Sequence, residues 1–143
     1  MKESLMKQAI TDLRENTCSC VVCADDRILF AEKGDGLAPL FAVYLENREQ
    51  LAGAYAFDKA VGTAAASLLV DAGVALVYGE TMSFGAKQIL AEADIETVCE
   101  KLVPAILNRE GIGLCPLEKL LIDVPDNKDR VEKLRTFAES NQI

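Results

Sequence analysis

The stretch DKAVGTAAASLLVDAGVALVYGE, residues 58–80, carries the signals that decide the fold class. Asp58 is a favoured helix N-cap, Gly73 is typical of a helix end, and the alanine- and leucine-rich run between them favours a helix. The apolar residues that follow predict a short, fully buried strand over 74–79. A helix that leads directly into a buried strand indicates an α/β arrangement.

The segments before this stretch also show regular patterns. Apolar residues at helical spacing open the chain, β-branched and small apolar residues flank a turn at Asp25 and Asp26, and Pro39 lies near the start of another periodic run. The expected elements are a helix over 2–15, a hairpin of strands over 17–24 and 27–33, and a helix over about 37–47.

The segments after this stretch complete the expected topology. Ser83 is a suitable cap for a helix formed by FGAKQILAEA, and Cys115 stands at the start of PLEKLLID. The further expected elements are a strand over about 95–101 and a final helix over about 128–140. A hairpin followed by strand–helix units predicts one three-layer α/β/α domain over 1–143 with a mixed sheet and a core at about 17–122.

Composition and charge exclude some partners. The chain has 143 residues, half of them hydrophobic, and a formal net charge of −8. Such an acidic chain repels phosphate backbones unless basic residues cluster, and the sequence contains no run of Lys and Arg. The mixed charge run at 126–135 alternates in sign and predicts a solvated helix face. No nucleic-acid partner is expected.

The sequence also lacks membrane and export signals. No segment approaches the roughly 18 uncharged apolar residues of a spanning helix. The first segment, MKESLMKQAITDLREN, looks amphipathic and lacks the apolar core of a signal peptide. We therefore expect a cytoplasmic protein with no membrane partner, in which the five cysteines stay reduced.

The chain contains no histidine. Ser-His-Asp and Cys-His catalysis both need an imidazole base, so both are excluded. Proton transfer would fall to Asp, Glu, Lys, Tyr or Cys side chains with a shifted pKa. No motif indicates a cofactor, and none is expected.

Three motifs carry a resemblance to a known family: DKAVGTAAASLLVDAGV at 58–74, VYGETMS at 77–83 and NREGIGLCPLEK at 108–119. Together they resemble an uncharacterised prokaryotic family of domains of unknown function with the cytidine-deaminase-like fold. The similarity covers roughly residues 20–122. It implies this fold, with an extra helix after the hairpin, and a cleft at the starts of two central helices. It implies no particular reaction.

The residues at these two helix starts differ from those of active zinc deaminases. Those enzymes carry H-x-E at the start of one core helix and P-C-x-x-C at the start of the next. The corresponding stretches here are DKAVGTA at 58–64 and ETMSFGA at 80–86, and neither contains its motif. Without zinc ligands nothing lowers the pKa of a bound water. The resemblance therefore implies a metal-free cleft without zinc-dependent deaminase activity.

The implied cleft suits a small anionic or nucleotide-like ligand, because two helix N-termini bring unsatisfied N–H groups and positive dipole ends together there. The candidate ligand-binding residues are Asp58, Lys59, Gly62, Thr63, Glu80, Thr81, Ser83 and Arg109. Each also has a structural interpretation. Hydroxyls near helix starts act as caps, small residues permit close helix–sheet packing, and polar loop residues form turns.

The stretch CPLE at 115–118 leaves two interpretations of Cys115 open. In the first, Cys115 is a structural helix cap, and Glu118 reaches back to the N–H of the cap in a capping box. In the second, the helix start and a nearby Arg109 or Lys119 lower the thiol pKa below its usual value of about 8.5. Cys115 and Glu118 are then candidate catalytic residues.

The other cysteine cluster is expected to be structural. On a strand, Cys18 and Cys20 share one face and Cys23 points to the other. Three ligands cannot converge from a straight strand, so core packing is favoured and no metal site is expected.

Three functional hypotheses remain open. The first is a metal-free domain that binds a small anionic or nucleotide-like ligand. The second is an enzyme that uses Cys115 as a nucleophile or redox thiol, with Glu118 or Glu80 handling protons. The third is a non-catalytic homo-oligomeric module whose interface uses the first helix and the edge of the hairpin.

Overall fold

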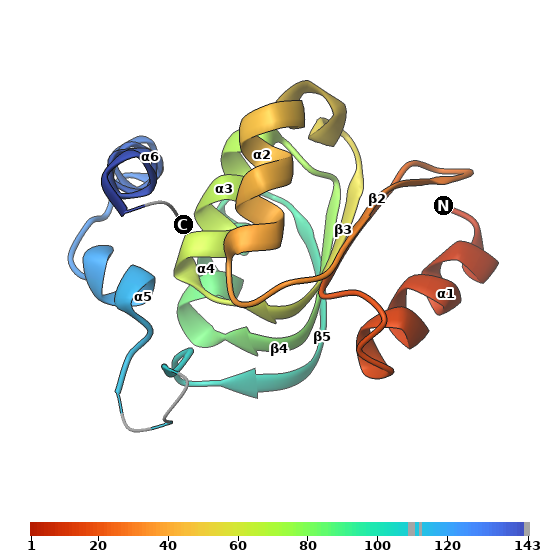
Figure 1. The fold of residues 1–143 in the computed structure, drawn as a ribbon, viewed down its shortest axis with the longest axis horizontal. Coiled ribbons are helices and arrows are strands. Elements are labelled where there is room, and N and C mark those ends of the chain that lie inside the picture. Colours follow the sequence, from red (N-terminus) through yellow and green to blue (C-terminus); the bar gives the residue numbers. More distant parts are fainter. Residues whose placement is uncertain (109–110, 112, 142–143) are drawn as a thin grey trace.

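The computed structural model describes residues 1–108, 111 and 113–141 (Figure 1). The elements are α1 (Glu3–Arg14), β1 (Cys20–Cys23), β2 (Ile28–Glu32), α2 (Ala38–Leu51), β3 (Tyr55–Val61), α3 (Thr63–Ala72), β4 (Leu76–Ser83), α4 (Phe84–Glu92), β5 (Glu96–Val103), α5 (Pro116–Leu120) and α6 (Asn127–Asn141). Over this described part of the chain, no helix is long and apolar enough to cross a membrane.

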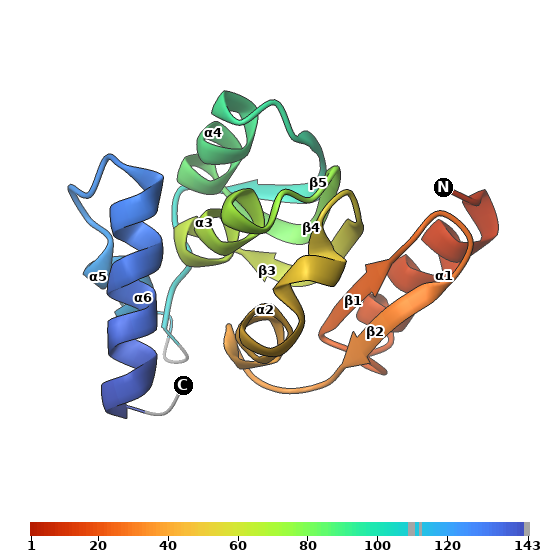
Figure 2. The ribbon, with the colours of Figure 1, turned by 90° about the horizontal axis from the view of Figure 1, so that it is seen from above.

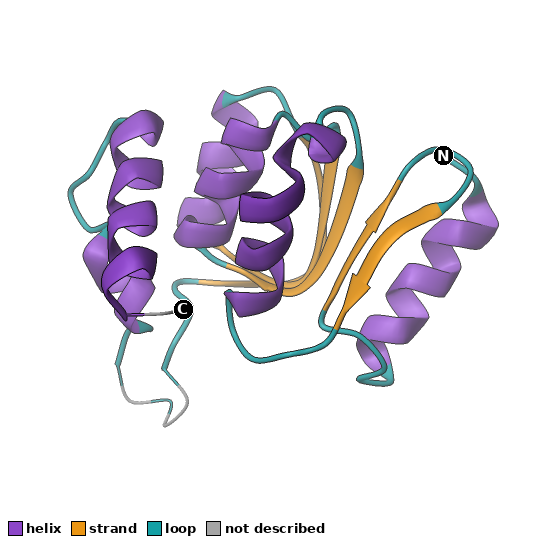
Figure 3. Ribbon diagram, turned by 45° about the horizontal axis from the view of Figure 1, so that its top comes forward, coloured by secondary structure: helices purple, strands orange, loops and turns teal. Residues whose placement is uncertain are grey.

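The five strands form one mixed sheet in the order β2-β1-β3-β4-β5. Strand β1 pairs antiparallel with β2 and β3, and β4 pairs parallel with β3 and β5. Helix α1 covers one face of the sheet, and α2, α3 and α4 cover the other (Figures 2 and 3). The expected three-layer α/β fold with a mixed sheet that begins with a hairpin is confirmed.

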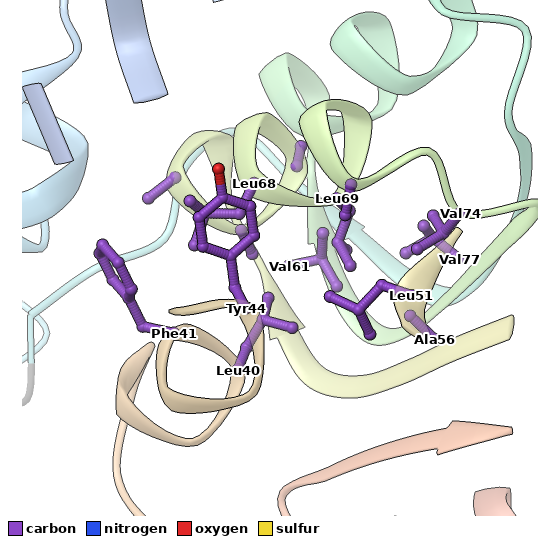
Figure 4. Packing of buried hydrophobic residues seen from close by; sticks show 14 of the residues in the cluster. Leu40, Phe41, Tyr44, Leu51, Ala56, Val61, Leu68, Leu69, Val74 and Val77 are labelled. Atoms are coloured by element: carbon purple, nitrogen blue, oxygen red, sulfur yellow. The ribbon is translucent and has the colours of Figure 1, made fainter. Parts of the chain in front are cut away.

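The larger part of the core lies between the sheet and the layer of α2, α3 and α4 (Figure 4). Helices α2 and α3 contribute large apolar side chains that are almost completely buried. Helix α3 is apolar on nearly all sides because it lies among α2, α4, α6 and the sheet. The residues labelled in this core are Leu40, Phe41, Tyr44, Leu51, Ala56, Val61, Leu68, Leu69, Val74 and Val77.

A smaller core lies under α1 on the opposite face. Ala9 and Leu13 of α1 are fully buried against Phe57, Leu76 and Tyr78 of the sheet. The apolar face of the first helix is therefore used within the chain. Of the two surfaces suggested for self-association, the open edge at β2 is the one that the fold leaves unpaired.

The prediction that Asp58 caps a helix is wrong. Residues 55–61 form β3, in which Asp58 pairs with Cys20 of β1 and Gly79 of β4. Pairing on both sides gives the backbone of this segment its hydrogen-bond partners, and this tertiary context overrides the helix propensity of the run. The helix begins only at Thr63, after Gly62 in an extended conformation.

Strand β4 runs further than predicted, to Ser83. Glu80 and Thr81 therefore lie inside the strand and not after its end. The capping role of Ser83 is confirmed, because its Oγ accepts a hydrogen bond from the Ala86 N–H at 3.1 Å. The strand leads directly into α4 at this residue.

The cysteines near the N-terminus are buried, in agreement with core packing. Their faces differ from the prediction. Cys18 and Cys23 pack in the core under α1, whereas Cys20 packs in the core under α2 and α3. The reason is that β1 begins only at Cys20, so Cys18 lies outside the strand and does not follow its alternation.

Gly73 ends α3 in the left-handed conformation, with φ of 75°. We expect Gly73→Ala to lower the free energy of unfolding by about 1 kcal/mol, because a Cβ is unfavourable in this region. Urea unfolding at pH 7 measures the effect. Gly73→Asn is the matched control and should cost less, since Asn tolerates this conformation. Equal losses in both variants would contradict the explanation.

Candidate functional site

The candidate site lies where α3 and α4 begin. Strands β3 and β4 are parallel, so their carboxyl ends, and the helices that follow them, lie at the same edge of the sheet. A Cβ placed on Gly85 would lie 3.2 Å from the Thr63 hydroxyl oxygen, so the first turns of the two helices are in close contact. The two helix N-termini expected to converge are therefore adjacent.

The N-terminus of α3 holds a carboxylate from the distal part of the chain. The Glu118 oxygens accept hydrogen bonds from the Thr63 N–H at 2.7 Å and from the Ala64 N–H at 2.9 Å. The first N–H groups of a helix have no partner within the helix, and its dipole favours a negative charge there. The distal segment therefore folds back over the helix starts and supplies an anion to one of them.

Gly62 makes this approach possible. A Cβ at Gly62 would lie 2.7 Å from Glu118 Cδ and 2.8 Å from Ile106 Cγ1, closer than side chains can pack. Glycine is therefore required here for the close approach of the Glu118 carboxylate, and the ligand-binding role suggested for Gly62 stays a prediction.

The capping-box prediction for Glu118 is wrong. Cys115 does stand at the N-cap of α5, but the Glu118 carboxylate binds the start of α3 and not the backbone of its own helix. The Cys115 N–H donates instead to the carbonyl oxygen of Ile106 at 3.1 Å. The two N–H groups of α3 give the carboxylate two good partners, and a capping box offers one.

A cavity of about 150 Å³ adjoins the Glu118 carboxylate. It is lined by Thr63, Ser83, Gly85, Pro104, Ala105, Leu114, Glu118, Leu121 and Ile122. A groove of about 660 Å³ shares Thr63, Gly85 and Leu121 with this cavity and extends along α4. We call the cavity and the groove together the crevice. Its inner end has two helix N-termini, which favour a small anion, and the Glu118 carboxylate already occupies one of them. Glu92 and Asp123 add further carboxylates to the groove.

Lys59 and Glu80 lie away from the crevice, on the face of the sheet covered by α1. Lys59 Nζ donates to the Leu13 carbonyl oxygen at 2.8 Å and to Asn16 Oδ1 at 2.5 Å, and it lies 3.6 Å from Glu80 Oε1. A cation near the last carbonyl groups of a helix is stabilising. Lys59 therefore fastens the end of α1 to the sheet.

Asp58 is buried inside the sheet, beside Cys20 and Gly79. Burial raises the pKa of Asp58 to about 8, against the opposing effect of the Ala60 and Lys59 backbone N–H groups. Thr81 is a partly exposed residue of β4 that pairs with Lys101. Thr63, Ser83, Gly62 and Glu118 are thus the predicted residues that the fold brings together.

Cys115 is partly buried and lines a different hollow of about 850 Å³, together with Ala60, Ile106 and Asn108. Its thiol makes no capping hydrogen bond within residues 1–108, 111 and 113–141. Arg109, predicted to bind an anion, lies outside the described residues. The catalytic role suggested for Cys115 stays a prediction.

The charge run at 126–135 is solvated as predicted except at one residue: Arg130 is buried, while the other charged residues are exposed, namely Asp126, Lys128, Asp129, Glu132, Lys133 and Arg135. Arg130 is only 8% exposed, and it donates to Ser67 Oγ of α3 and to the carbonyl oxygens of Val124 and Pro125. Val131 and Leu134 on the same helix are buried. Their spacing marked an apolar side of α6, but nothing in the sequence indicated that a charged neighbour would be buried with them.

No group of three or more His, Cys, Asp or Glu side chains in the described regions could hold a metal ion. The starts of α3 and α4 contain Gly62, Thr63 and Ser83 and neither H-x-E nor P-C-x-x-C, the motifs of zinc deaminases. The strand order and this crevice define an α/β domain with the cytidine-deaminase-like fold and without the zinc motifs.

Residues 8–138 match the family TM1506, described as a domain of unknown function (DUF1893), and the chain belongs to this family. A solved structure of the DUF1893 family protein TM1506 from Thermotoga maritima matches with a TM-score of 0.85 and 24% identity, over 95% of this chain and 91% of that one. This match, like the family, carries no assigned function.

Two structures of RibD from Acinetobacter baumannii, form 2 and form 1, match with TM-scores of 0.49 and 0.48 and 24% identity. They cover 67% and 66% of this chain, and 34% and 33% of theirs. The chain therefore spans about a third of RibD. No curated protein matches the sequence.

The role of Gly62 is tested by Gly62→Ala. We expect the added Cβ to displace the Glu118 carboxylate and to lower the free energy of unfolding by about 2–3 kcal/mol, the cost of losing charge-assisted hydrogen bonds and of local strain. Urea unfolding measures the loss, and amide hydrogen exchange at Thr63 and Ala64 should become faster. Gly113→Ala is the control, because its Cβ would meet only Asn108 Nδ2 at 3.6 Å.

The buried carboxyl group of Asp58 predicts a pH dependence. Between about pH 4 and pH 8 the folded state keeps a proton on Asp58 that the unfolded chain has lost, so this group makes the fold less stable as the pH rises through that range. Asn cannot titrate. We expect Asp58→Asn to resemble wild type near pH 4 and to gain stability toward pH 8, on the order of 5 kcal/mol at most.

Urea unfolding of both proteins at pH 4, 6 and 8 measures this difference. Asp26→Asn, at an exposed turn position, is the control and should leave the pH dependence unchanged. A constant difference between Asp58→Asn and wild type across the range would show that Asp58 is ionised in the folded protein.

Proposed function

We propose that this protein is a metal-free binding domain for a small ligand with a carboxylate or phosphate group, and that the ligand occupies the crevice at the starts of α3 and α4. The observation that supports this most directly is the bidentate contact of Glu118 with Thr63 and Ala64. A carboxylate already fits this position with good hydrogen-bond geometry, so a free anion of similar size has a matching set of donors.

The helix starts at this position favour an anion despite the net charge of −8 and the carboxylates of Glu118, Glu92 and Asp123 that also line the crevice. Two helix dipoles point their positive ends into the crevice, and Thr63 and Ser83 place hydroxyl groups on its wall. Local donors decide binding at short range because distant surface charges are screened by salt. The crevice also has room beyond the anion position for a ligand body, in the groove along α4.

Further parts of the proposal follow from the sequence. The ligand class includes nucleotide-like molecules, the acidic chain excludes nucleic acid as a partner, and the location is the cytoplasm. Self-association through the edge of β2 and thiol chemistry at Cys115 remain alternative hypotheses. Neither has a contact in its support that compares with the bound carboxylate in the crevice.

Chemical rescue tests the anion position. We expect Glu118→Ala to lose about 3 kcal/mol of stability, because two charge-assisted hydrogen bonds at a helix start are lost. Sodium acetate or formate should restore part of this loss, relative to sodium chloride of equal ionic strength, since the free anion can occupy the vacated donors. Thermal unfolding across a range of acetate concentrations measures the rescue.

The control is Glu132→Ala, which removes the same charge from an exposed position of α6. It should respond equally to acetate and to chloride. An identical response of Glu118→Ala to the two salts would contradict the proposed anion position. Native mass spectrometry of freshly purified wild-type protein, compared with its denatured mass, then reports any retained ligand or metal.

A further inference from the structure

Strand β5 is the second open edge of the sheet, at the side opposite β2 (Figure 2). Its eight residues, Glu96–Val103, keep one register with β4 from end to end and include no proline. Strand β2 has only five residues, and a register shift interrupts its pairing with β1. Long, regular edges invite pairing with another chain, and bulges, prolines or a short length usually prevent it. Strand β5 has charged side chains but none of these backbone features.

The face of β5 on the α1 side of the sheet is only partly covered. Val98 and Leu102 share this face with Glu100, whose carboxylate binds Arg14 of α1. Helix α1 packs mainly against β1, β3 and β4, and the side chains of Val98 and Leu102 are 44% and 40% exposed. They therefore offer apolar contacts to a strand that pairs with this edge.

The backbone of β5 also presents hydrogen-bonding groups at the edge. The Glu96 N–H donates to the Ala75 carbonyl oxygen at 3.3 Å, so Glu96 directs its backbone groups toward β4. This direction alternates along a strand in a parallel pair, and the odd-numbered residues of β5 therefore direct their N–H and carbonyl groups outward. A further strand can form hydrogen bonds with them.

We propose that β5 pairs antiparallel with β5 of a second copy of this chain, about a twofold axis beside Glu100, so that the two five-stranded sheets join into one. In this register Val98 lies opposite Leu102 of the second copy, and the symmetry forms this apolar pair twice. The interface is separate from the crevice and does not depend on the proposed function.

The side chains of the strand select this register. A continuous sheet about a twofold axis keeps the α1 faces of both copies on the same side, so residues of that face meet one another. They form the non-hydrogen-bonded pairs, in which side chains come closest. With the axis moved by one residue, to Cys99 or Lys101, Val98 or Leu102 would lie opposite Glu100. The axis beside Glu100 places apolar residues opposite each other.

The charges at this axis are self-complementary. Glu100 lies opposite Glu100 of the second copy, and like charges in this position repel each other. Arg14 binds Glu100 within each chain, and its exposed guanidinium has further N–H donors. The Arg14 hydrogen bond also lowers the pKa of Glu100, which therefore stays ionised. Two guanidinium groups and two carboxylates thus meet at the axis, where each Arg14 can bind the carboxylates of both copies.

Light scattering coupled to size-exclusion chromatography tests the interface. At tens of micromolar, wild type should have about twice the chain mass of 15.5 kDa. Leu102→Lys should weaken dimerisation about tenfold or more, because the symmetry removes two apolar pairs at once. Val98→Lys serves in the same way if Leu102→Lys does not fold. A monomeric wild type would overturn the proposal and leave the edge to a strand of a different protein.

Matched substitutions identify the surface. Ile28→Lys at the β2 edge and Leu45→Lys on α2 replace apolar side chains that are 38% and 55% exposed. Both variants should dimerise as wild type does. A dimer that survives Leu102→Lys and Val98→Lys would overturn the proposal, and its loss in Ile28→Lys would place the interface at β2 instead.

Charge reversal tests the contact at the axis. Arg14→Glu and Glu100→Arg each give the axis four like charges, so each variant alone should dimerise poorly. Mixed together they should form a heterodimer, because one copy then supplies only carboxylates and the other only guanidinium groups. Native mass spectrometry separates the heterodimer from the two homodimers by mass. A mixture without preference for the heterodimer would overturn the pairing about Glu100, since an ion pair that acts only within one chain gives no such preference.

Discussion

The start of α3 is the constraint around which the distal half of the chain is arranged. A helix that begins directly after a buried strand leaves its first N–H groups without partners inside the protein, where water is scarce. Glu118 satisfies two of them, and the absence of a side chain at Gly62 allows it to come close enough. The position of α5, and the cavity beside it, follow from this contact.

A second group of polar side chains, on the face of the sheet covered by α1, has a different role from Glu118. On the α1 face, Lys59 binds the last turn of α1 and lies beside Glu80, while Arg14 at the end of α1 pairs with Glu100 of β5. In the described part of the chain, the Tyr78 hydroxyl and Glu80 Oε2 are buried without a hydrogen-bond partner. This cluster holds one helix against the sheet, and the crevice on the other side of the sheet is left to the helix starts.

Local signals in the sequence predicted the fold well, and non-local contacts explain where they failed. Ser83 begins α4 and Gly73 ends α3, as their residue types predict, because capping depends on the adjacent backbone. Asp58 was assigned to a helix because its strand exists only through pairing with β1 and β4. Gly62, Thr63 and Ser83, named as candidate ligand-binding residues, lie together at the helix starts, and their binding role stays a prediction.

The role of Glu118 could not be read from its neighbours. Its hydrogen-bond partner Thr63 lies 55 residues away in the sequence, while a capping box was available within its own motif. Arg130 was hidden for a similar reason, because a charged residue in an alternating run gives no indication that Ser67 and two carbonyl groups will surround it. Both side chains take their roles from the tertiary fold.

This separation in sequence has a consequence for the order of events during synthesis. The sheet and its covering helices are complete at Val103, whereas the acceptor for the α3 N-terminus arrives only with Glu118. A nascent chain that has emerged as far as β5 can form its strand pairing, but it leaves the Thr63 and Ala64 N–H groups to water or to a passing anion. The last step of folding is then the docking of the distal segment, α5 followed by α6, and this docking closes a site that was still open on the ribosome-bound chain.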